Sequence, residues 1–254
     1  MTTIVTGYFE LDISKASPDK YRLWMSNMLM NNNPMVIFCD ENSYNTINEL
    51  RKGNETNTRI IITDFEEFLC YRYVNHFHNH MRLDHELKRG HNLFLYMIWN
   101  EKSNFLKRAI ELNPFNSDYF LWVDIGCFRL PNTEFLNWPN PKRIEEIPKD
   151  KVLLLSVEPF SPIELSINKL EDLPNFQRAN RIGAPIFGGG KEILLKWHQL
   201  YYQMLECFII NNRFIGKDQS IMNSVYLINR DICELISWKT PCNNMWFYLQ
   251  DYLK

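Results

Sequence analysis

Short, unbroken runs of apolar residues recur along this chain, and most of them end at a polar residue or a glycine. Strands that are buried on both faces have this pattern, whereas strands with one solvated face alternate apolar and polar residues. The runs lie at 3–8, 35–39, 59–64, 119–124 and 152–158. Segments with helical spacing separate them. This order predicts an α/β domain with a largely parallel sheet.

Two longer segments carry the apolar spacing of amphipathic helices. Residues 191–210 place apolar side chains at intervals of three and four, and residues 92–112 do so more loosely. Ser17 followed by Pro18 is typical of a helix N-cap with proline in the first turn. The proline-rich stretch 131–148 predicts an irregular excursion between two strands. No repeat or linker divides the chain, so we expect one domain.

Composition excludes several classes of protein. The chain has 254 residues with 28 Lys and Arg against 30 Asp and Glu, a net charge of −2. Such a balance gives no overall field for binding nucleic acid or anionic lipid, so we expect no nucleic-acid partner. No stretch approaches the roughly 18 apolar residues of a transmembrane segment, and the first residues lack a secretory pattern. We therefore expect a cytoplasmic protein, with its six cysteines reduced.

Polar residues follow several predicted strands, at the edge where open α/β sheets bind ligands. Thr6 belongs to the first run, and Asp40, Asp64 and Asp124 end or follow later runs. An aspartate after a strand also forms turns and helix N-caps, and we favour that interpretation for Asp40 and Asp64. Asp124 is the candidate functional carboxylate of this set.

Short motifs occur along the chain in a distinctive order. They are Ile4-Val5-Thr6, Pro34-Met35-Val36-Ile37-Phe38, Trp99-Asn100-Glu101-Lys102, Asn113-Pro114-Phe115, Trp122-Val123-Asp124-Ile125-Gly126, Phe187-Gly188-Gly189 and Asp218-Gln219. This order resembles the HtrL/YibB-like family, which is placed among glycosyltransferase-like sequences of the GT-A fold. The resemblance covers most of the chain, and the order of the motifs is more specific than any one of them.

The resemblance implies an α/β fold of the GT-A-like (Rossmann-like) kind, with a mostly parallel central sheet flanked by helices in a single domain, 1–254. A nucleotide-binding half would span about 1–126, and an acceptor or sugar half about 127–254. The implied activity is transfer of a sugar from a nucleotide-diphosphate sugar, such as a UDP-sugar, to a hydroxyl of a glycan, protein or lipid-linked acceptor. The alternative is a non-catalytic protein of this shape that binds a nucleotide or glycan.

The resemblance also bears on metal binding. GT-A glycosyltransferases carry an apolar strand that ends in Asp-x-Asp, whose carboxylates hold a divalent ion against the diphosphate of the donor. Here Asp124 occupies the first position and Gly126 the third. Asp124 is thus implied to hold Mn²⁺ or Mg²⁺, directly or through water, or the ribose. Because these ions need several oxygen ligands, we expect weak metal binding until a nucleotide supplies its phosphates.

A catalytic role is implied for the Asp218-Gln219 motif. Asp218 would be the carboxylate at the reacting sugar, as a base or as a stabiliser of charge, with Glu158 in reserve. Gln219 would face the sugar or the acceptor. Equally, Asp218 fits the N-cap of the helix that follows, where its carboxylate would accept backbone N–H groups.

Charge and position suggest which residues would contact the phosphates and the base of the donor. Lys102 and Arg51 are candidates for contact with the phosphates. Lys102 is preferred by analogy with the family. Thr6 and Tyr8, at the end of the first run, would border the base. Exposed Lys and Arg side chains most often face solvent only, and that interpretation stays open for both cations.

The glycines before the helix at 191–210 allow two interpretations. Without side chains, Gly188 and Gly189 would let the backbone approach the transferred sugar. Alternatively, they form a tight turn that opens the helix. A phosphate-binding P-loop is not expected, because its first glycine is absent and Glu192 replaces Ser or Thr.

Five of the six histidines fall in one stretch, at His76, His78, His80, His85 and His91. Imidazole binds zinc, copper and iron, so this density raises the possibility of a metal-dependent hydrolase. The spacing matches no zinc motif, and the surrounding Lys and Arg side chains favour a solvated helical face instead.

Overall fold

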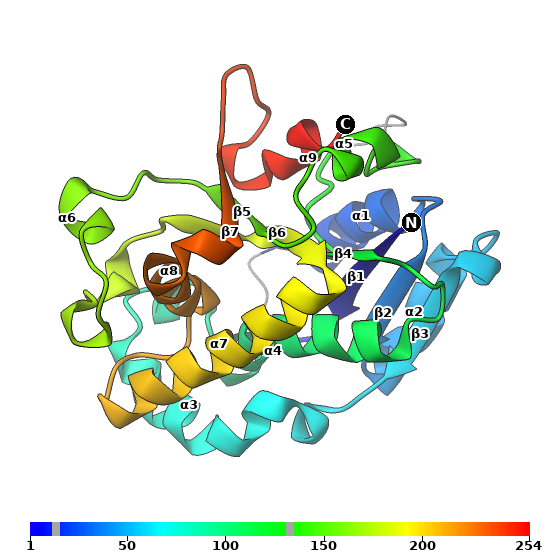
Figure 1. Cartoon of the computed structure of the whole chain (residues 1–254). Coiled ribbons are helices and arrows are strands. Elements are labelled where there is room, and N and C mark those ends of the chain that lie inside the picture. The colour runs from blue at the N-terminus through cyan, green and yellow to red at the C-terminus, as the bar shows by residue number, and fades with distance from the viewer. Residues whose placement is uncertain (12–15, 131–134) are drawn as a thin grey trace.

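The computed structural model describes residues 1–11, 16–130 and 135–254. A seven-stranded sheet of order β3-β2-β1-β4-β6-β5-β7 runs through the molecule (Figure 1). The strands are β1 (Thr2–Tyr8), β2 (Met35–Cys39), β3 (Thr58–Ile62), β4 (Tyr119–Val123), β5 (Val152–Ser156), β6 (Ile182–Gly190) and β7 (Cys233–Ser237). The helices are α1 (Pro18–Leu29), α2 (Glu41–Leu50), α3 (Val74–His80), α4 (Leu93–Leu112), α5 (Pro141–Glu145), α6 (Pro162–Leu165), α7 (Lys191–Ile210), α8 (Asp218–Ile228) and α9 (Leu249–Tyr252). The fold is a mixed α/β domain, as the sequence predicts.

Most neighbouring strands run parallel, and β6 is the exception. It pairs antiparallel with β4 and with β5, whereas the other strand pairs are parallel. Val123, the last residue of β4, lies opposite Ile186 of β6. The next residue, Asp124, donates its N–H to the carbonyl oxygen of Pro185 at 2.7 Å. The amino-terminal part of β6 therefore lies beside the carboxyl end of β4.

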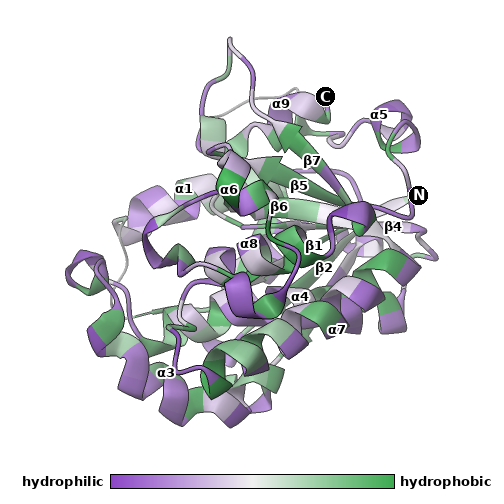
Figure 2. Ribbon diagram, turned by 60° about the vertical axis from the view of Figure 1, so that its left-hand side comes forward, coloured by the Kyte–Doolittle hydropathy of each residue, from purple (hydrophilic) through white to green (hydrophobic). Residues whose placement is uncertain are grey.

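Alternate residues of the central strands point to opposite faces, and each face has its own buried core. Phe120 and Trp122 of β4 belong to a core shared with α4, α7 and α8. Leu121 and Val123 belong to the core on the other face, shared with α1 and α9. Helices cover both faces in Figure 1, and Figure 2 shows the apolar strands between them. Burial on both faces explains the unbroken apolar runs.

The five predicted strands are confirmed, with ends that differ by at most two residues. β3 differs in burial: it lies at an edge of the sheet and leaves Ile62 43% exposed. β6 and β7 are strands that the sequence pattern does not predict. β6 contains Pro185 and ends in three glycines, a composition that normally indicates a turn.

The predicted helices are confirmed as α4 and α7, and their ends follow ordinary capping chemistry. Asn92 Oδ1 accepts the N–H of Leu95 at 2.9 Å and so caps α4, while Ser17 caps α1. Asp40 caps α2, and Asp64 forms a capping box at a 3-10 turn. The turn interpretation of these two aspartates is thereby confirmed.

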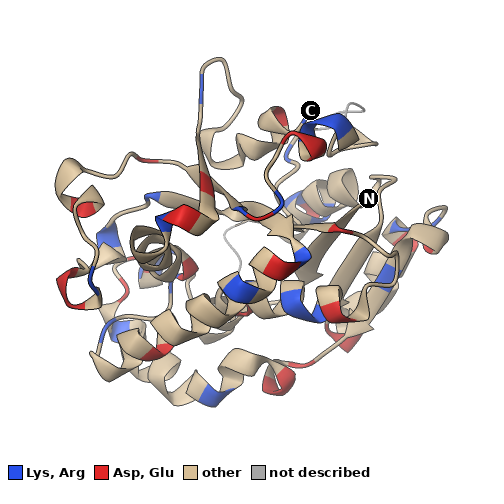
Figure 3. Ribbon diagram, in the orientation of Figure 1, with Lys and Arg blue, Asp and Glu red and all other residues tan. Residues whose placement is uncertain are grey.

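Residues of both charges are spread along the ribbon of the molecule (Figure 3). In the described part of the chain, no helix has the length and apolar character needed to cross a membrane. The first residues of the proline-rich excursion, 131–134, lie outside the described residues; its remainder contains α5.

Candidate active site

Three charged side chains meet beside the carboxyl end of β4. Lys102, from the middle of α4, places its Nζ atom 3.0 Å from Asp124 Oδ1 and 3.0 Å from Asp218 Oδ2. Asp124 follows β4, and Asp218 is the first residue of α8. The side chains of Lys102, Asp218 and Asp124 are 4%, 7% and 33% exposed. A buried ammonium thus joins two carboxylates from distant parts of the sequence.

The Lys102 ammonium has three oxygen partners in this cluster. Besides its ion pairs with the two carboxylates, it donates a hydrogen bond to the carbonyl oxygen of Ala184 in β6 at 3.2 Å. Burial alone would lower the pKa of Lys102, but the carboxylates of Asp124 and Asp218 raise it above its usual value. Lys102 is therefore charged at neutral pH and fully paired.

Each carboxylate of the cluster has a further partner. Trp122 Nε1 donates to Asp124 Oδ1 at 2.7 Å, and the N–H of Gln219 donates to Asp218 Oδ1 at 2.8 Å. Burial raises the pKa of Asp124, while the interactions with Lys102 and Trp122 oppose that rise. These bonds fix the orientation of both carboxylates before any ligand binds.

Two adjoining cavities, of about 440 and 480 Å³, open over the cluster. Both are lined by Trp99, Lys102, Asp124, Arg129 and Phe247. The first, called here the α8 cavity, is also lined by Glu86, His91, Asn180, Ala184, Pro185, Lys217, Asp218, Gln219, Asn244 and Trp246. The second, the β1 cavity, extends along the end of β1 and is also lined by Gly7, Tyr8, Tyr21, Trp24 and Gly126, among others. A ligand that spans both cavities would pass over Lys102 and Asp124.

Aromatic rings form much of the β1 cavity. Tyr8 and Tyr21 are stacked with ring centroids 5.7 Å apart, and Trp24 lies 6.1 Å from Tyr21. A Cβ atom on Gly126 would come within 3.3 Å of the Tyr21 ring. Gly126 occupies the place of the second carboxylate in the metal motif, and the packing of Tyr21 against it leaves little room for a side chain there.

A comparison with protein families gives one match over almost the whole chain. The profile of HtrL_YibB, described as bacterial protein of unknown function, matches residues 1–249. The chain belongs to the HtrL/YibB family. Among curated proteins, Protein HtrL of Escherichia coli strain K12 is 22% identical over 264 residues, which cover 92% of this chain and 87% of that protein.

Among solved structures, apo mouse xyloside xylosyltransferase 1 superposes with a TM-score of 0.50 at 8% sequence identity, over 97% of this chain and 94% of that one. At this identity the likeness concerns the fold alone. It shows that this member of the HtrL/YibB family has a GT-A-like fold.

The structure brings five of the ten predicted site residues together at the two cavities. Those that line the two cavities are Tyr8, Lys102, Asp124, Asp218 and Gln219. Thr6 lies nearby in β1 but is fully buried and lines neither cavity. Gln219 donates from Nε2 to the carbonyl oxygen of Ile182 at 3.0 Å, which ties the start of α8 to β6.

Arg51 and Glu158 lie away from the cavities. The buried Arg51 guanidinium donates to the Leu29 carbonyl oxygen and to Thr58 Oγ1, both at 2.8 Å, and to the Asn31 carbonyl oxygen. It joins loops at the other end of the sheet. Glu158 pairs with Arg181 at 3.2 Å. Neither residue lines either cavity, and each has an ion-pair or hydrogen-bond partner of its own.

Gly188 and Gly189 also lie away from the site. They are paired within β6, opposite Leu121 and Phe120 of β4, and β6 runs antiparallel to β4. The glycines therefore lie toward the amino end of β4, while Asp124 lies at its carboxyl end. Neither interpretation from sequence describes them, since they form neither a sugar-binding turn nor a turn opening α7.

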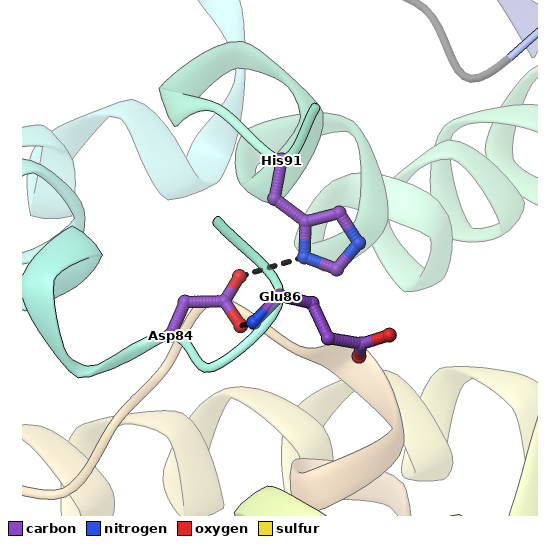
Figure 4. Close-up of side chains that lie close together, drawn as sticks. All are labelled: Asp84, Glu86 and His91. Carbon is purple, nitrogen blue, oxygen red and sulfur yellow. Dashed lines mark hydrogen bonds and ion pairs between the residues drawn. The ribbon is translucent and has the colours of Figure 1, made fainter. Parts of the chain in front are cut away.

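The histidine stretch does not form one site. His80 contacts Asn212, and His85 contacts Arg178. Only Asp84, Glu86 and His91 form a described group whose ligand atoms could hold a metal ion (Figure 4). In that group, His91 Nδ1 lies 2.6 Å from Asp84 Oδ2.

Other partners already occupy the carboxylates of this group. The Tyr96 hydroxyl also donates to Asp84 Oδ2, at 2.7 Å. Glu86 pairs with Lys217 of the α8 cavity and with Arg89. A metal ion would have to compete with both cations for Glu86.

Several cavity residues carry no signal in the sequence. Arg129 follows no motif, and Trp246 and Phe247 belong to a segment near the carboxyl end that has no regular spacing. Their presence at the site depends on how distant segments pack. The Asn244 side chain caps the 3-10 turn that carries Trp246 and Phe247, and this local cue is too weak to predict a site.

Proposed function

We propose that this protein is a glycosyltransferase that moves a sugar from a nucleotide-diphosphate sugar to an acceptor hydroxyl. The observation that carries the proposal is the position of Lys102, Asp124 and Asp218 beneath two joined cavities, at the carboxyl edge of a GT-A-like sheet. Ligands of open α/β sheets bind at this edge. The name of the xylosyltransferase with a similar fold supports the same class of reaction.

The two cavities suit two parts of such a donor. The stacked rings of Tyr8 and Tyr21 offer a flat apolar surface for the base in the β1 cavity. The sugar and the acceptor would occupy the α8 cavity, which Asp218 and Gln219 line. This assignment supports a nucleotide-binding half at about 1–126 and an acceptor half at about 127–254.

In the proposed reaction, the acceptor oxygen forms a bond to the anomeric carbon of the sugar. The bond from that carbon to the phosphate oxygen breaks, and its electron pair leaves with the nucleoside diphosphate. The acceptor proton passes to the carboxylate of Asp218 as general base. Asp124, at the junction of the cavities, would accept hydrogen bonds from the ribose or the sugar.

The donor atoms at Asp124 do not fit a resident divalent ion. Asp124 Oδ1 and Asp218 Oδ1 already accept N–H groups from Trp122 and Gln219, and the Lys102 ammonium lies 3.0 Å from Asp124 Oδ1 and 3.0 Å from Asp218 Oδ2. Mg²⁺ and Mn²⁺ require about six oxygen ligands, whereas one carboxylate oxygen of Asp124 is left. We therefore assign no step of the reaction to a metal ion at Asp124.

A thermal-shift screen with UDP-, GDP-, dTDP- and CMP-sugars tests the proposal. We expect one class of nucleotide to stabilise the protein by about 2.7 kcal/mol when the ligand is present at 100 times its dissociation constant. For a protein of this size, that corresponds to a rise in melting temperature of roughly 5–10 °C. If no nucleotide sugar raises the melting temperature at millimolar concentration, the proposed function is wrong.

The second candidate function is binding without turnover, which Gly126 favours because the usual second carboxylate is absent. Slow hydrolysis of the bound donor distinguishes the two. We expect wild-type protein to release nucleoside diphosphate, and Asp218→Asn to reduce that rate by about 100-fold or more, because the base is lost. Asp118→Asn, an exposed aspartate just before β4, is the matched control. Nucleotide binding with no release by wild-type protein would instead support the non-catalytic function.

A further inference from the structure

Among the residues that the structure describes, three Lys and Arg side chains line the two cavities, and they differ in how they are paired. Lys102 and Arg129 line both cavities, and Lys217 lines the α8 cavity. Lys102 forms ion pairs with Asp124 and Asp218 and donates to a carbonyl oxygen, and Lys217 pairs with Glu86. Among residues 1–11, 16–130 and 135–254, no carboxylate pairs with Arg129. Of the described cavity cations, Arg129 is therefore the one that is available to a ligand.

Two aromatic side chains hold the Arg129 guanidinium. Its central carbon lies 4.4 Å from the centroid of the Trp24 ring and 4.7 Å from that of Phe247. Trp24 belongs to α1, and Phe247 to the carboxyl-terminal segment, so the arginine joins two distant elements at the cavity mouth. Ring contacts occupy the faces of a guanidinium and leave its N–H edge for hydrogen bonds. Arg129 is thus positioned in advance and remains exposed.

The charge of the neighbouring cluster shows why a ligand phosphate needs this arginine. One ammonium and two carboxylates give Lys102, Asp124 and Asp218 a net charge of −1. A diphosphate brought to the junction of the cavities would meet that negative charge. Lys102 is buried, and turning its ammonium toward the phosphates would weaken its two ion pairs or its hydrogen bond to Ala184. The compensating cation must come from elsewhere on the cavity wall.

We propose that Arg129 binds the diphosphate of the donor and that this binding needs no divalent ion, because the Lys102 ammonium occupies the space between the two carboxylates. The inference rests on the proposed function and adds the group that recognises the leaving phosphate. A guanidinium forms two parallel hydrogen bonds to one phosphate group. The same bonds would stabilise the charge that develops on the departing nucleoside diphosphate.

Calorimetry with nucleoside diphosphates tests the inference, with UDP, GDP, dTDP and CDP as probes and each parent nucleoside as a comparison. For wild-type protein we expect diphosphate affinity to change by less than about twofold between excess EDTA and added Mn²⁺. In Arg129→Gln, diphosphate affinity should fall by about 10- to 100-fold through the loss of charge-assisted bonds, while nucleoside affinity stays the same. Arg129→Lys should recover part of the loss, since it restores the charge without the planar fork.

The control is Arg213→Ala. Arg213 also stacks on an aromatic ring, with its central carbon 5.5 Å from the Phe208 centroid, but lines neither cavity. This variant should bind the probes as wild type does. Melting temperatures of all variants show whether they are folded.

Three results would overturn the inference, and they can be told apart. If Arg129→Gln binds diphosphates as tightly as wild type, the role of Arg129 is wrong while the proposed function stands. If EDTA abolishes diphosphate binding by wild-type protein, a divalent ion is required. If neither nucleotides nor nucleosides bind wild-type protein, the proposed function fails and this inference fails with it.

Discussion

Replacing Lys102 by alanine is expected to lower the free energy of unfolding by about 3–5 kcal/mol, because it leaves the two carboxylates of Asp124 and Asp218 close together without their cation. The lower part of this range is expected, since Asp124 is still one-third exposed and keeps some contact with water. Denaturant unfolding measures the change. The matched control is Lys107→Ala on the same helix, whose exposed pair with Glu111 should contribute less than about 1 kcal/mol.

The deficit of Lys102→Ala should depend on pH in a defined direction. Burial raises the pKa of Asp124 even with Lys102 present, and removal of the ammonium raises it further. A carboxylate with a raised pKa in the folded state binds its proton there before it does so in the unfolded chain. The loss in free energy of unfolding caused by Lys102→Ala should therefore be largest above the folded-state pKa of Asp124. It should become smaller as the pH falls through that pKa.

A divalent ion offers a second measurement on the same variant. With Lys102 removed, the two carboxylates resemble the paired oxygen ligands that Mn²⁺ prefers. We expect Mn²⁺ to raise the melting temperature of Lys102→Ala but not that of wild-type protein. Equal stability of the variant and wild type at neutral pH would contradict the buried position of this ion pair.

The strands and long helices could be predicted from the sequence because their signals are local. β2, β4 and β5 are buried on both faces and read as unbroken apolar runs, and α7 carries its own spacing and begins after a glycine. β6 could not be predicted in this way. Its glycines are required because a Cβ atom at Gly188 or Gly189 would meet the neighbouring backbone at Phe120 or Lys151. These close approaches exist only in the assembled sheet, so they leave no local signal in the sequence.

Some residues of the candidate site could likewise be predicted from local motifs, and others could not. Asp124 and Asp218 stand out in the sequence because each follows or opens an element at a recognisable motif. Lys102 also belongs to a motif, but the sequence does not reveal that its ammonium forms ion pairs with both carboxylates. Arg51 carries the same charge at the end of α2, yet its guanidinium donates to buried carbonyl oxygens. Which cation is free for a ligand depends on three-dimensional partners alone.

The glycine at position 188 is expected to be essential for folding, and we expect Gly188→Ala to lower the free energy of unfolding by about 3 kcal/mol or more. A Cβ atom there would lie 2.6 Å from Leu121 Cδ2 and would also press against the backbone carbonyl oxygen of Phe120. Strand backbone cannot move aside without breaking the ladder that joins β4 to β6. Denaturant unfolding measures the loss.

The matched control is Gly53→Ala, at a turn with φ of 91° where a Cβ atom meets nothing within 4 Å. It carries only the backbone penalty of the left-handed region, about 1 kcal/mol. The two variants separate the structural role of Gly188 from the sugar-binding role that its sequence also suggests. If Gly188 were needed only to let a sugar approach the backbone, Gly188→Ala would keep a normal melting temperature and would hydrolyse the donor more slowly. Because Gly188 is paired inside the sheet, opposite Leu121 in the middle of β4, we expect the opposite: a large loss of stability.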